Sequence, residues 1–374
     1  MCLYSHTLNE EQKARSFRPP PQGRAHGQEH PDRKPKPAPP GGCAYARPMG
    51  EFDLIARYFR RPVRRAALGV GDDCALLAPA AGMQLAVSSD MLVEGRHFFA
   101  DVYPAHLGHK ALAVNLSDLA ACGARPLAFT LALALPRADE VWLQGFSEGL
   151  LALAGEHGCE LVGGDTTQGP LNICITVFGE VPAGQALLRS GARPGDDLWV
   201  SGHLGDARLA LDALLGEMPV QLPPQLLAQA RERLERPTPR VALGQALRGV
   251  ASSAIDVSDG LVGDLGHILQ ASGVGARINT SLAPQLMAAC AGHAPGQLPC
   301  GRENLLRCVL AGGDDYELLF TAPPGRRAQV EAAARQGGTR ATCIGAIEAE
   351  PGLRLLDAQG QQMDAQYLAF DHFR

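Results

Sequence analysis

Aspartates that follow apolar stretches are the residues of this sequence with the clearest capacity for chemistry. Each stands beside glycine or small polar residues, and each alone fits a turn or helix cap equally well, because Asp and Gly favour both. Turns do not require Asp at every such position, so the set as a whole points to function. The six motifs are Gly71-Asp72-Asp73, Ser88-Ser89-Asp90, Asn115-Leu116-Ser117-Asp118, Gly163-Gly164-Asp165-Thr166-Thr167, Asp256-Val257-Ser258-Asp259-Gly260 and Gly312-Gly313-Asp314-Asp315.

If these motifs converge in the fold, several carboxylates share a small volume. Like charges at close range raise carboxylate pKa values and destabilise the fold unless cations neutralise them. Hard divalent cations prefer such oxygen ligands, whereas no His/Cys cluster accompanies the aspartates to select a softer metal. Mg²⁺ usually bridges carboxylates to phosphates, and Gly163-Gly164 would let backbone N–H groups approach phosphate oxygens. The residues therefore indicate an Mg²⁺-dependent enzyme that acts on a nucleotide or another phosphate.

Lysine usage excludes the commonest nucleotide-binding loop. The chain has four lysines, at positions 13, 34, 36 and 110. A Walker A loop needs Gly-Lys-Ser/Thr, but Ala111 follows the one lysine beyond residue 48, and the protein-kinase lysine motif is absent. For Lys110 itself, the prediction is a salt bridge on the surface of a helix.

Composition narrows the class of protein further. The chain has 374 residues, of which 46% are hydrophobic and 20% charged, which is typical of a globular protein with room for two domains. Residues 49–374 hold 26 Lys+Arg against 35 Asp+Glu, and this acidic balance argues against nucleic acid as a partner. The sequence has no C-x-x-C pair, no signal-peptide pattern and no apolar run near the roughly 18 residues of a membrane helix. We therefore expect a cytoplasmic protein with no membrane partner.

Residues 1–48 differ from the rest of the chain. They hold 9 of the 28 prolines, and they carry 8 Lys+Arg against 4 Asp+Glu. Proline-rich, charged sequence of this kind cannot build a core, so we expect a disordered or extended tail. Met49 then opens a well-patterned segment. Our hypothesis is that Met49 is the natural start of the protein, and that residues 1–48 are either a misassigned start or a dispensable tail.

From residue 50 the apolar pattern alternates between helical and strand periods, which predicts an α/β fold in both halves. The turn Arg193-Pro194-Gly195-Asp196 is the candidate boundary between an N-terminal domain, 49–192, and a C-terminal domain, 193–374. The expected helices are 104–122, 139–157, 205–216, 224–235, 239–248, 260–271 and 326–336. The expected strands are 85–88, 127–135, 159–162, 173–181, 198–200, 253–257, 316–321 and 341–347.

Taken in order, these motifs closely resemble those of the thiamine-monophosphate kinase family, in the superfamily of aminoimidazole ribonucleotide synthetase and selenophosphate synthetase. The match runs from Gly50 to the C-terminus. The stretches that carry it are Gly50-Glu51-Phe52, Gly71-Asp72-Asp73-Cys74-Ala75, Ser88-Ser89-Asp90, Glu94-Gly95-Arg96-His97-Phe98, Lys110–Ala120, Gly163–Thr167, Arg189-Ser190-Gly191-Ala192, Ile255–Leu261, Gly312–Leu318 and Phe370-Asp371-His372-Phe373.

The resemblance implies a role for each matching position. Asp73, Ser88, Ser89, Asp90, Asp118, Asp165, Asp256 and Asp259 correspond to Mg²⁺ ligands. Gly164, Asp165, Arg189 and Ser258 correspond to ATP contacts, and His97, Asp314 and Phe370 to contacts with thiamine phosphate. Family members often carry Glu where Asp314 stands and Tyr or Trp where Phe370 stands, so those two positions depart from the pattern.

The resemblance also implies the reaction, in which ATP and thiamine phosphate give ADP and thiamine diphosphate. It implies a two-domain fold of the aminoimidazole ribonucleotide synthetase type, ATP near the domain cleft and a homodimer whose N-terminal sheets pack together. The acceptor oxygen is already largely deprotonated at neutral pH, so we expect no general base and no phosphoenzyme, with His97 in a positioning role.

Two other functions remain open at this point. One is a related ATP-using synthetase, although residues 88–98 lack the lysine or reactive cysteine that those enzymes place near this loop. The other is a non-catalytic protein that binds thiamine phosphate or a nucleotide. Loss of the metal-binding aspartates would indicate such a protein, and all of them are present.

Overall fold

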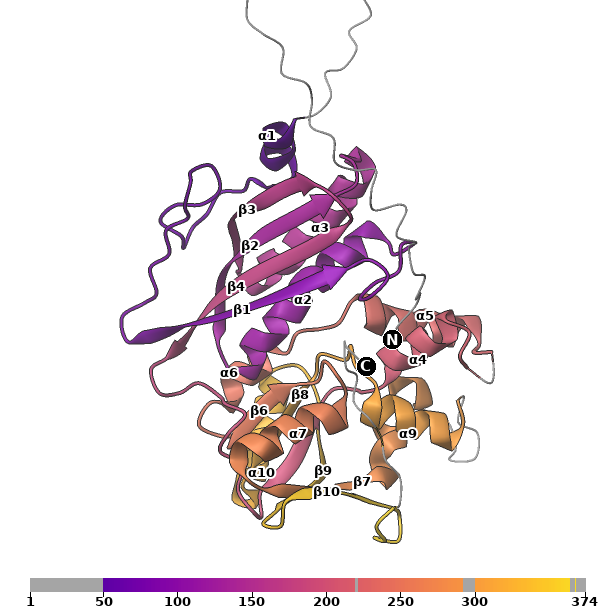
Figure 1. Ribbon diagram of the computed structural model, residues 1–374. Helices are drawn as coiled ribbons and strands as arrows, with labels where there is room; N and C mark the ends of the chain where they lie inside the picture. Colours follow the sequence, from indigo (N-terminus) through magenta and orange to yellow (C-terminus); the bar gives the residue numbers. More distant parts are fainter. Residues whose placement is uncertain (1–49, 219–220, 292–299, 364–366, 368–374) are drawn as a thin grey trace, which may run out of the picture. The chain divides into compact units, whose positions relative to one another are not determined.

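The computed structural model describes residues 50–218, 221–291, 300–363 and 367 (Figure 1). The tail 1–48 and Phe370 lie outside the described residues, so the predictions made for them are not addressed by the structure. In the described part of the chain, none of the helices combines the length and apolar character that crossing a bilayer requires.

The first sheet has four strands in the order β1-β4-β2-β3, formed by β1 (Met83–Val93), β4 (Asn172–Pro182), β2 (Arg125–Leu135) and β3 (Glu160–Gln168). Strand β4 runs antiparallel to both β1 and β2, whereas β2 and β3 are parallel. The parallel pair requires a crossover, which α3 (Glu140–His157) supplies. As predicted, Asp139 caps this helix, because its Oδ1 accepts the N–H groups of Val141 and Trp142 at 3.1 Å.

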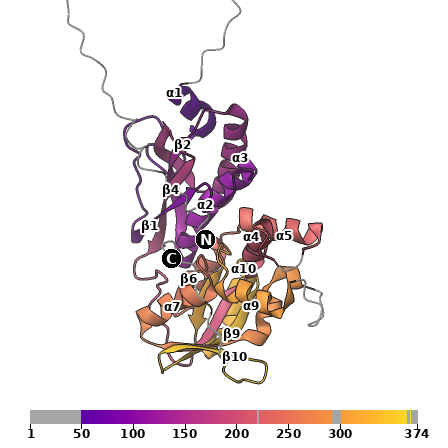
Figure 2. The ribbon, with the colours of Figure 1, turned by 45° about the vertical axis from the view of Figure 1, so that its right-hand side comes forward.

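Helix α2 (Pro104–Ala121) lies with α3 on one side of this sheet (Figure 2). The two helices pack backbone to backbone, since a Cβ on Gly108 would lie 2.0 Å from the carbonyl oxygen of Phe146. On its other side α2 meets α6 (Val241–Leu247), where a Cβ on Gly244 would lie 2.0 Å from the carbonyl oxygen of Ala120. Helix α2 is therefore buried between the two halves of the molecule.

The second sheet has six strands in the order β10-β7-β9-β5-β8-β6. Strands β10 and β7 are parallel, and the other pairs are antiparallel. Its strands are β5 (Asp197–Ser201), β6 (Ser253–Asp256), β7 (Gly275–Asn279), β8 (Leu318–Ala322), β9 (Ala341–Glu348) and β10 (Gly352–Leu356).

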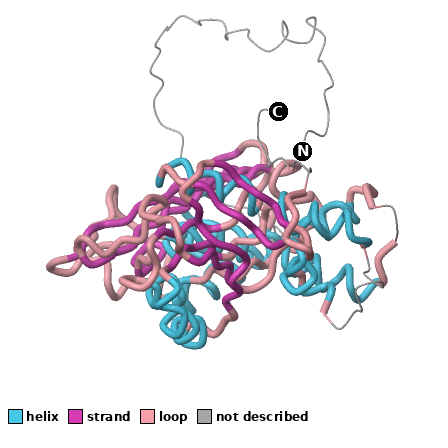
Figure 3. Tube along the Cα trace, turned by 90° about the horizontal axis from the view of Figure 1, so that it is seen from below, coloured by secondary structure: helices cyan, strands magenta, loops and turns pink. Residues whose placement is uncertain are grey.

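A hydrophobic core lies between the second sheet and helices of the same half, and it draws on strands β5 to β10. Figure 3 shows the strands gathered together, with helices on more than one side of them. The helices that contribute to this core are α4 (Asp206–Leu214), α5 (Pro224–Glu235), α7 (Leu261–Ser272), the short α8 (Ala283–Leu286) and α9 (Gly301–Ala311). Helix α10 (Arg327–Gln336) contacts α6 and β9. A further short helix, α1 (Glu51–Leu54), opens the described chain.

The mixed α/β prediction is confirmed, and the predicted helices and strands all occur, with two boundary errors that matter for the site. Strand β1 continues to Val93, so Asp90 lies within a strand rather than at its end. Strand β3 continues to Gln168, so the segment 163–167 is extended strand and not the loop we expected. The pattern missed β7, β10, α8 and α9. The boundary at 193 stays a prediction, and it falls between the last strand of the first sheet and the first strand of the second.

Candidate active site

Three of the predicted aspartates approach one another around α2. Asp90 comes from β1, Asp118 from the last turn of α2 and Asp256 from the end of β6. The hydroxyl of Ser88 donates to Asp118 Oδ2, and that of Ser117 donates to Asp256 Oδ2 at 2.7 Å. Both sheets thus deliver a carboxylate to the same helix.

Burial disfavours the charged form of all three carboxylates, and neighbouring carboxylates add to this for Asp90 and Asp256. Burial, followed by the charges of Asp118 and Asp259, raises the pKa of Asp90 to about 6. Burial and the charge of Asp118 raise the pKa of Asp256 to about 8, although the Ser117 hydroxyl opposes this. Burial also raises the pKa of Asp118, against the opposing effects of Ser88 and Arg189. Three ionised carboxylates are therefore unfavourable here unless cations accompany them.

The loop after β6 carries Ser258 and Asp259, and a single carboxylate holds it in shape. Asp264 Oδ2 accepts the backbone N–H groups of Ser258, Asp259 and Gly260, each at 3.1 Å. Burial and the charge of Asp259 raise the pKa of Asp264 to about 7 despite these three hydrogen bonds. The loop is thus fixed at the N-terminus of α7, with three of its N–H groups bound by the Asp264 carboxylate.

The two described residues predicted to contact thiamine phosphate are brought together by a lysine. Lys110 Nζ lies 3.1 Å from Asp314 Oδ1 and donates to the carbonyl oxygen of His97 at 3.1 Å. Its side chain is 3% exposed, so the prediction of a surface salt bridge is wrong: the pair is buried on the lysine side. His97 Nδ1 accepts the N–H of Val93 at 3.0 Å, so the neutral ring carries its proton on Nε2.

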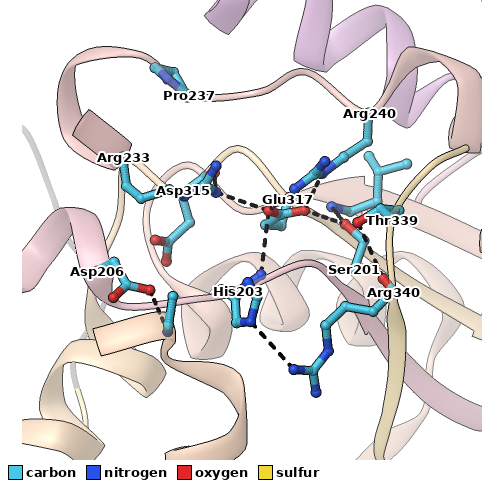
Figure 4. Close-up of polar contacts among 12 residues, drawn as sticks. Ser201, His203, Asp206, Arg233, Pro237, Arg240, Asp315, Glu317, Thr339 and Arg340 are labelled. Atoms are coloured by element: carbon cyan, nitrogen blue, oxygen red, sulfur yellow. Dashed lines mark hydrogen bonds and ion pairs between the residues drawn. The ribbon is translucent and has the colours of Figure 1, made fainter. Parts of the chain in front are cut away.

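A network of buried carboxylates and their partners anchors the segment that follows Asp314 (Figure 4). Glu317 is fully buried and accepts hydrogen bonds from Ser201 and Arg240 at 2.6 Å and from Arg233 at 2.9 Å. The buried carboxylate of Asp315 accepts the N–H of Gly205 at 2.9 and 3.0 Å. These contacts fix the chain on both sides of Tyr316 and so fix the position of Asp314.

Other predicted site residues lie apart from this cluster. Ser89 follows Ser88 in a strand, so its side chain takes the opposite face of the sheet, where it contacts Thr176. Gly164 and Asp165 lie on β3, at the far edge of the sheet from β1. Asp73 is exposed in the segment 63–77, which packs on β2 and β3.

Sequence reasoning gave no site role to several polar residues that shape the site. Asn115 Oδ1 accepts the N–H of Asp90 at 3.1 Å, and Ser117 and Asp264 orient the carboxylate and the loop described above. Asn115, Ser117 and Lys110 are all buried within α2, which is otherwise apolar over most of its length. A buried polar residue in an apolar helix needs a partner. In the sequence, polar residues within an otherwise apolar helical segment were the feature that could have identified these residues.

The donor set fits Mg²⁺ bound together with phosphates, rather than a metal enclosed by protein. In the described ranges, no three His, Cys, Asp or Glu side chains are grouped so as to hold an ion by themselves. Mg²⁺ commonly binds through one or two carboxylates and completes its shell with water and substrate phosphates. Asp90, Asp118 and Asp256 offer such oxygens, and a cation beside them would favour the charged forms that burial disfavours.

Comparison with known proteins assigns the chain to a family. Residues 71–181 match the N-terminal domain, and residues 193–358 the C-terminal domain, of the AIR synthase related proteins. The chain is 47% identical over 329 residues to the thiamine-monophosphate kinase of Salmonella typhimurium, covering 87% of this chain and 98% of that relative. The chain belongs to the thiamine-monophosphate kinase family.

Solved structures agree with that assignment. The thiamine-monophosphate kinase of Stenotrophomonas maltophilia superposes with a TM-score of 0.72 at 43% identity, covering 83% of this chain and 95% of that one. A structure described as AaThiL complexed with AMPPCP and TMP superposes with a TM-score of 0.64 at 32% identity, over 79% and 89% of the two chains. The family resemblance read from the sequence is confirmed.

The raised pKa values predict how the metal-free protein responds to pH. A carboxyl whose pKa is higher in the folded than in the unfolded state stabilises the fold at low pH, and this stabilisation is lost as pH rises through the folded value. The melting temperature measured in EDTA should therefore fall by a few degrees between about pH 7 and pH 8.5, as Asp256 and Asp264 ionise. Each kcal/mol of lost stability corresponds to about 2–4 °C in melting temperature. Buried histidines act in the opposite sense mainly below this window.

Thermal melts at a series of pH values test this expectation. Asp256→Asn should flatten the decline, whereas Asp139→Asn, which removes a charge but keeps a good helix cap, should leave it unchanged. A melting temperature that stays level or rises across the window in EDTA would show that the carboxylates are not held in an unfavourable charge state.

Proposed function

We propose that this chain transfers the γ-phosphoryl group of ATP to thiamine phosphate, yielding ADP and thiamine diphosphate. The observation that carries the proposal is the convergence of Asp90, Asp118 and Asp256 in a chain of this family. A relative was solved with the ATP analogue AMPPCP and with TMP, which supports the same pair of substrates here.

In the proposed roles, Asp90, Asp118 and Asp256 provide carboxylate oxygens for Mg²⁺, with Ser88 beside them and Asp259 toward a further ion. When bound, Mg²⁺ would offset the repulsion between the two phosphate-bearing substrates. Arg189 lies close enough to lower the pKa of Asp118, and with Ser258 it would bind the ATP phosphates. Asp264 keeps the Ser258 loop in the conformation that this binding needs.

Transfer in this proposal is direct. A phosphate oxygen of thiamine phosphate forms a bond to the γ-phosphorus as the bond to the β-phosphate oxygen breaks, and ADP leaves. His97, with Nδ1 committed to a backbone N–H, would position the acceptor through Nε2, and Asp314 would bind its other end. No proton acceptor is needed, because the attacking oxygen is already largely ionised at neutral pH.

We also propose a homodimer, because one chain does not bring all the predicted ligands together. Asp73 and Asp165 lie toward β3, whereas the cluster lies on the β1 side. Strands β1 and β3 are the two edges of the first sheet, each paired on one side among the described strands. The β1 face turned away from the helices exposes Leu85, Val87 and Met91 by 45–55%. A second copy packed on this sheet would cover that face and bring Asp165 of one chain toward the cluster of the other.

The cytoplasm is the location we propose, because the reaction consumes ATP.

The reaction is tested with purified residues 49–374, ATP, Mg²⁺ and thiamine phosphate, with thiamine diphosphate followed as its fluorescent thiochrome product. Product should depend on Mg²⁺. Asp118→Asn should lower kcat/KM by at least about a hundredfold, as expected for several kcal/mol of lost charge stabilisation. Metal-free Asp118→Asn should melt no lower than the wild type, since it relieves repulsion.

Asp139→Asn serves as the matched control and should retain full activity. Unchanged turnover in Asp118→Asn would remove Asp118 from the metal site. Folded wild-type protein that forms no thiamine diphosphate would contradict the proposed reaction itself.

The dimer is tested by light scattering at micromolar concentration. Wild-type protein should have twice the chain mass, and Val87→Asp should give single chains with much reduced activity, because a charge on the apolar face opposes association. Val141→Asp places the same charge at another exposed valine, on α3, and should change neither property. Wild-type protein of single-chain mass would contradict the homodimer.

A further inference from the structure

Lys110 is unusual because of its residue type and its burial. It is the one lysine in residues 49–374, where the other 25 basic Lys/Arg side chains are arginines. Arginine serves at solvent-exposed sites throughout this part of the chain, so basic surface charge alone does not account for a lysine. A compact ammonium on a flexible stem fits where a planar guanidinium fork does not. The position of Lys110 is such a place, since its side chain is 3% exposed.

The contacts of Lys110 join segments that are distant in sequence. Its ammonium donates to the carbonyl oxygen of His97, in the connection between β1 and α2. The same nitrogen lies 3.1 Å from Asp314 Oδ1, in the connection between α9 and β8. The first segment belongs to the half of the chain with the four-stranded sheet, and the second to the half with the six-stranded sheet. One side chain on α2 therefore connects the two halves at the proposed acceptor site.

The backbone at Asp314 is held in a conformation that non-glycine residues rarely adopt. Asp314 has φ of 65° and Tyr316 has φ of 51°, and they are the non-glycine residues with positive φ in the described part of the chain. Such a conformation costs on the order of 1–3 kcal/mol per residue and persists where the surroundings fix it. Two backbone hydrogen bonds of 2.9 Å help to fix this conformation. The N–H of Asp314 donates to the carbonyl oxygen of Ser258, and the N–H of Tyr316 donates to that of Val257.

The alternation of side chains along this segment shows what the strained backbone achieves. Asp315 and Glu317 turn into the second half of the molecule, where Gly205, Ser201 and two arginines bind them (Figure 4). Asp314 and Tyr316 turn the other way, and the Tyr316 hydroxyl donates to Asp314 Oδ1 at 3.2 Å. Lys110 and Tyr316 thus both bind Oδ1, while the Asp314 side chain keeps 30% exposure. The carboxylate is oriented by protein and still accessible to a substrate.

We propose that Lys110 is a positioning residue for the acceptor: it fixes the carboxylate of Asp314 and the backbone at His97 relative to each other, and so sets the affinity for thiamine phosphate. This rests on the proposed assignment of His97 and Asp314 to the acceptor. ATP binding is assigned to other residues, at Arg189 and Ser258. Loss of Lys110 should therefore raise KM for thiamine phosphate and leave KM for ATP within about twofold.

Steady-state kinetics of Lys110→Met, Asp314→Asn and the double variant test the proposal. Loss of a charge-assisted hydrogen bond predicts that each single variant raises KM for thiamine phosphate about tenfold to a hundredfold. The double variant should be no worse than the poorer single one, because both substitutions remove the same interaction. Lys110→Gln keeps a donor for His97 but no charge, and it should behave like Lys110→Met if the Asp314 contact dominates.

The control is Arg327→Met, which removes the cation of a pair with Asp197 at 2.6 Å on the second sheet. It should leave both KM values unchanged, which separates loss of an ion pair in general from loss of this one. Circular dichroism and melting temperature establish that each variant is folded. Where Lys110→Met does not fold, Lys110→Gln carries the test.

The outcomes separate this inference from the proposed function. A raised KM in Asp314→Asn with an unchanged KM in Lys110→Met and Lys110→Gln would overturn the positioning role alone. Equal increases in the KM values for both substrates, or strictly additive effects in the double variant, would overturn it as well. An unchanged KM for thiamine phosphate in Asp314→Asn would instead remove Asp314 from the acceptor site and with it the basis of the inference.

Discussion

The cost of placing three aspartates together in buried or half-buried surroundings is the constraint around which this structure is organised. Asp90, Asp118 and Asp256 come from a strand, a helix and a strand end, and burial makes the charged form of each unfavourable. A protein selected for stability alone would replace them with neutral or apolar side chains. Their presence is intelligible when a cation and a phosphate-bearing ligand share the site, since these supply the missing charge.

Helix α2 is the element that makes this arrangement possible. It carries Asp118 and Lys110 eight residues apart, a separation of about 12 Å along a helix axis. The proposed metal and acceptor contacts are thereby held at a fixed spacing that an extended two-ring substrate with a phosphate can bridge. Close packing on α3 and α6, at Gly108 and Gly244, keeps the helix from shifting between the two halves.

Local pattern was enough to predict most of the elements, because periodicity and caps are local properties. Asp139 shows this well: its position before an apolar helical period predicts the cap that the structure contains. The strands β7 and β10 were missed because an arginine interrupts the short apolar run of each, Arg277 in β7 and Arg354 in β10. Their pairing depends on neighbours distant in the chain, which no local window contains.

The candidate site was predictable in its chemistry but not in its geometry. The aspartates were identifiable from their spacing, whereas the division between the Asp118 cluster and Asp165 follows from strand order. Ser88 and Ser89 are adjacent in sequence, yet the pleat of β1 sends them to opposite faces. Lys110 was judged a surface residue, although the apolar residues around it in α2 indicated burial. Its partner Asp314 lies about 200 positions away in the chain.

Proton release on ligand binding is the most direct measure of the central claim, that these carboxylates exchange protons for Mg²⁺. Titration calorimetry of Mg²⁺ with a non-hydrolysable ATP analogue, in buffers of different ionisation enthalpy, counts the protons. We expect net release near pH 7 that diminishes toward pH 9 and is reduced in Asp256→Asn. Binding with no proton release at any pH, or with release that Asp256→Asn leaves unchanged, would contradict the account.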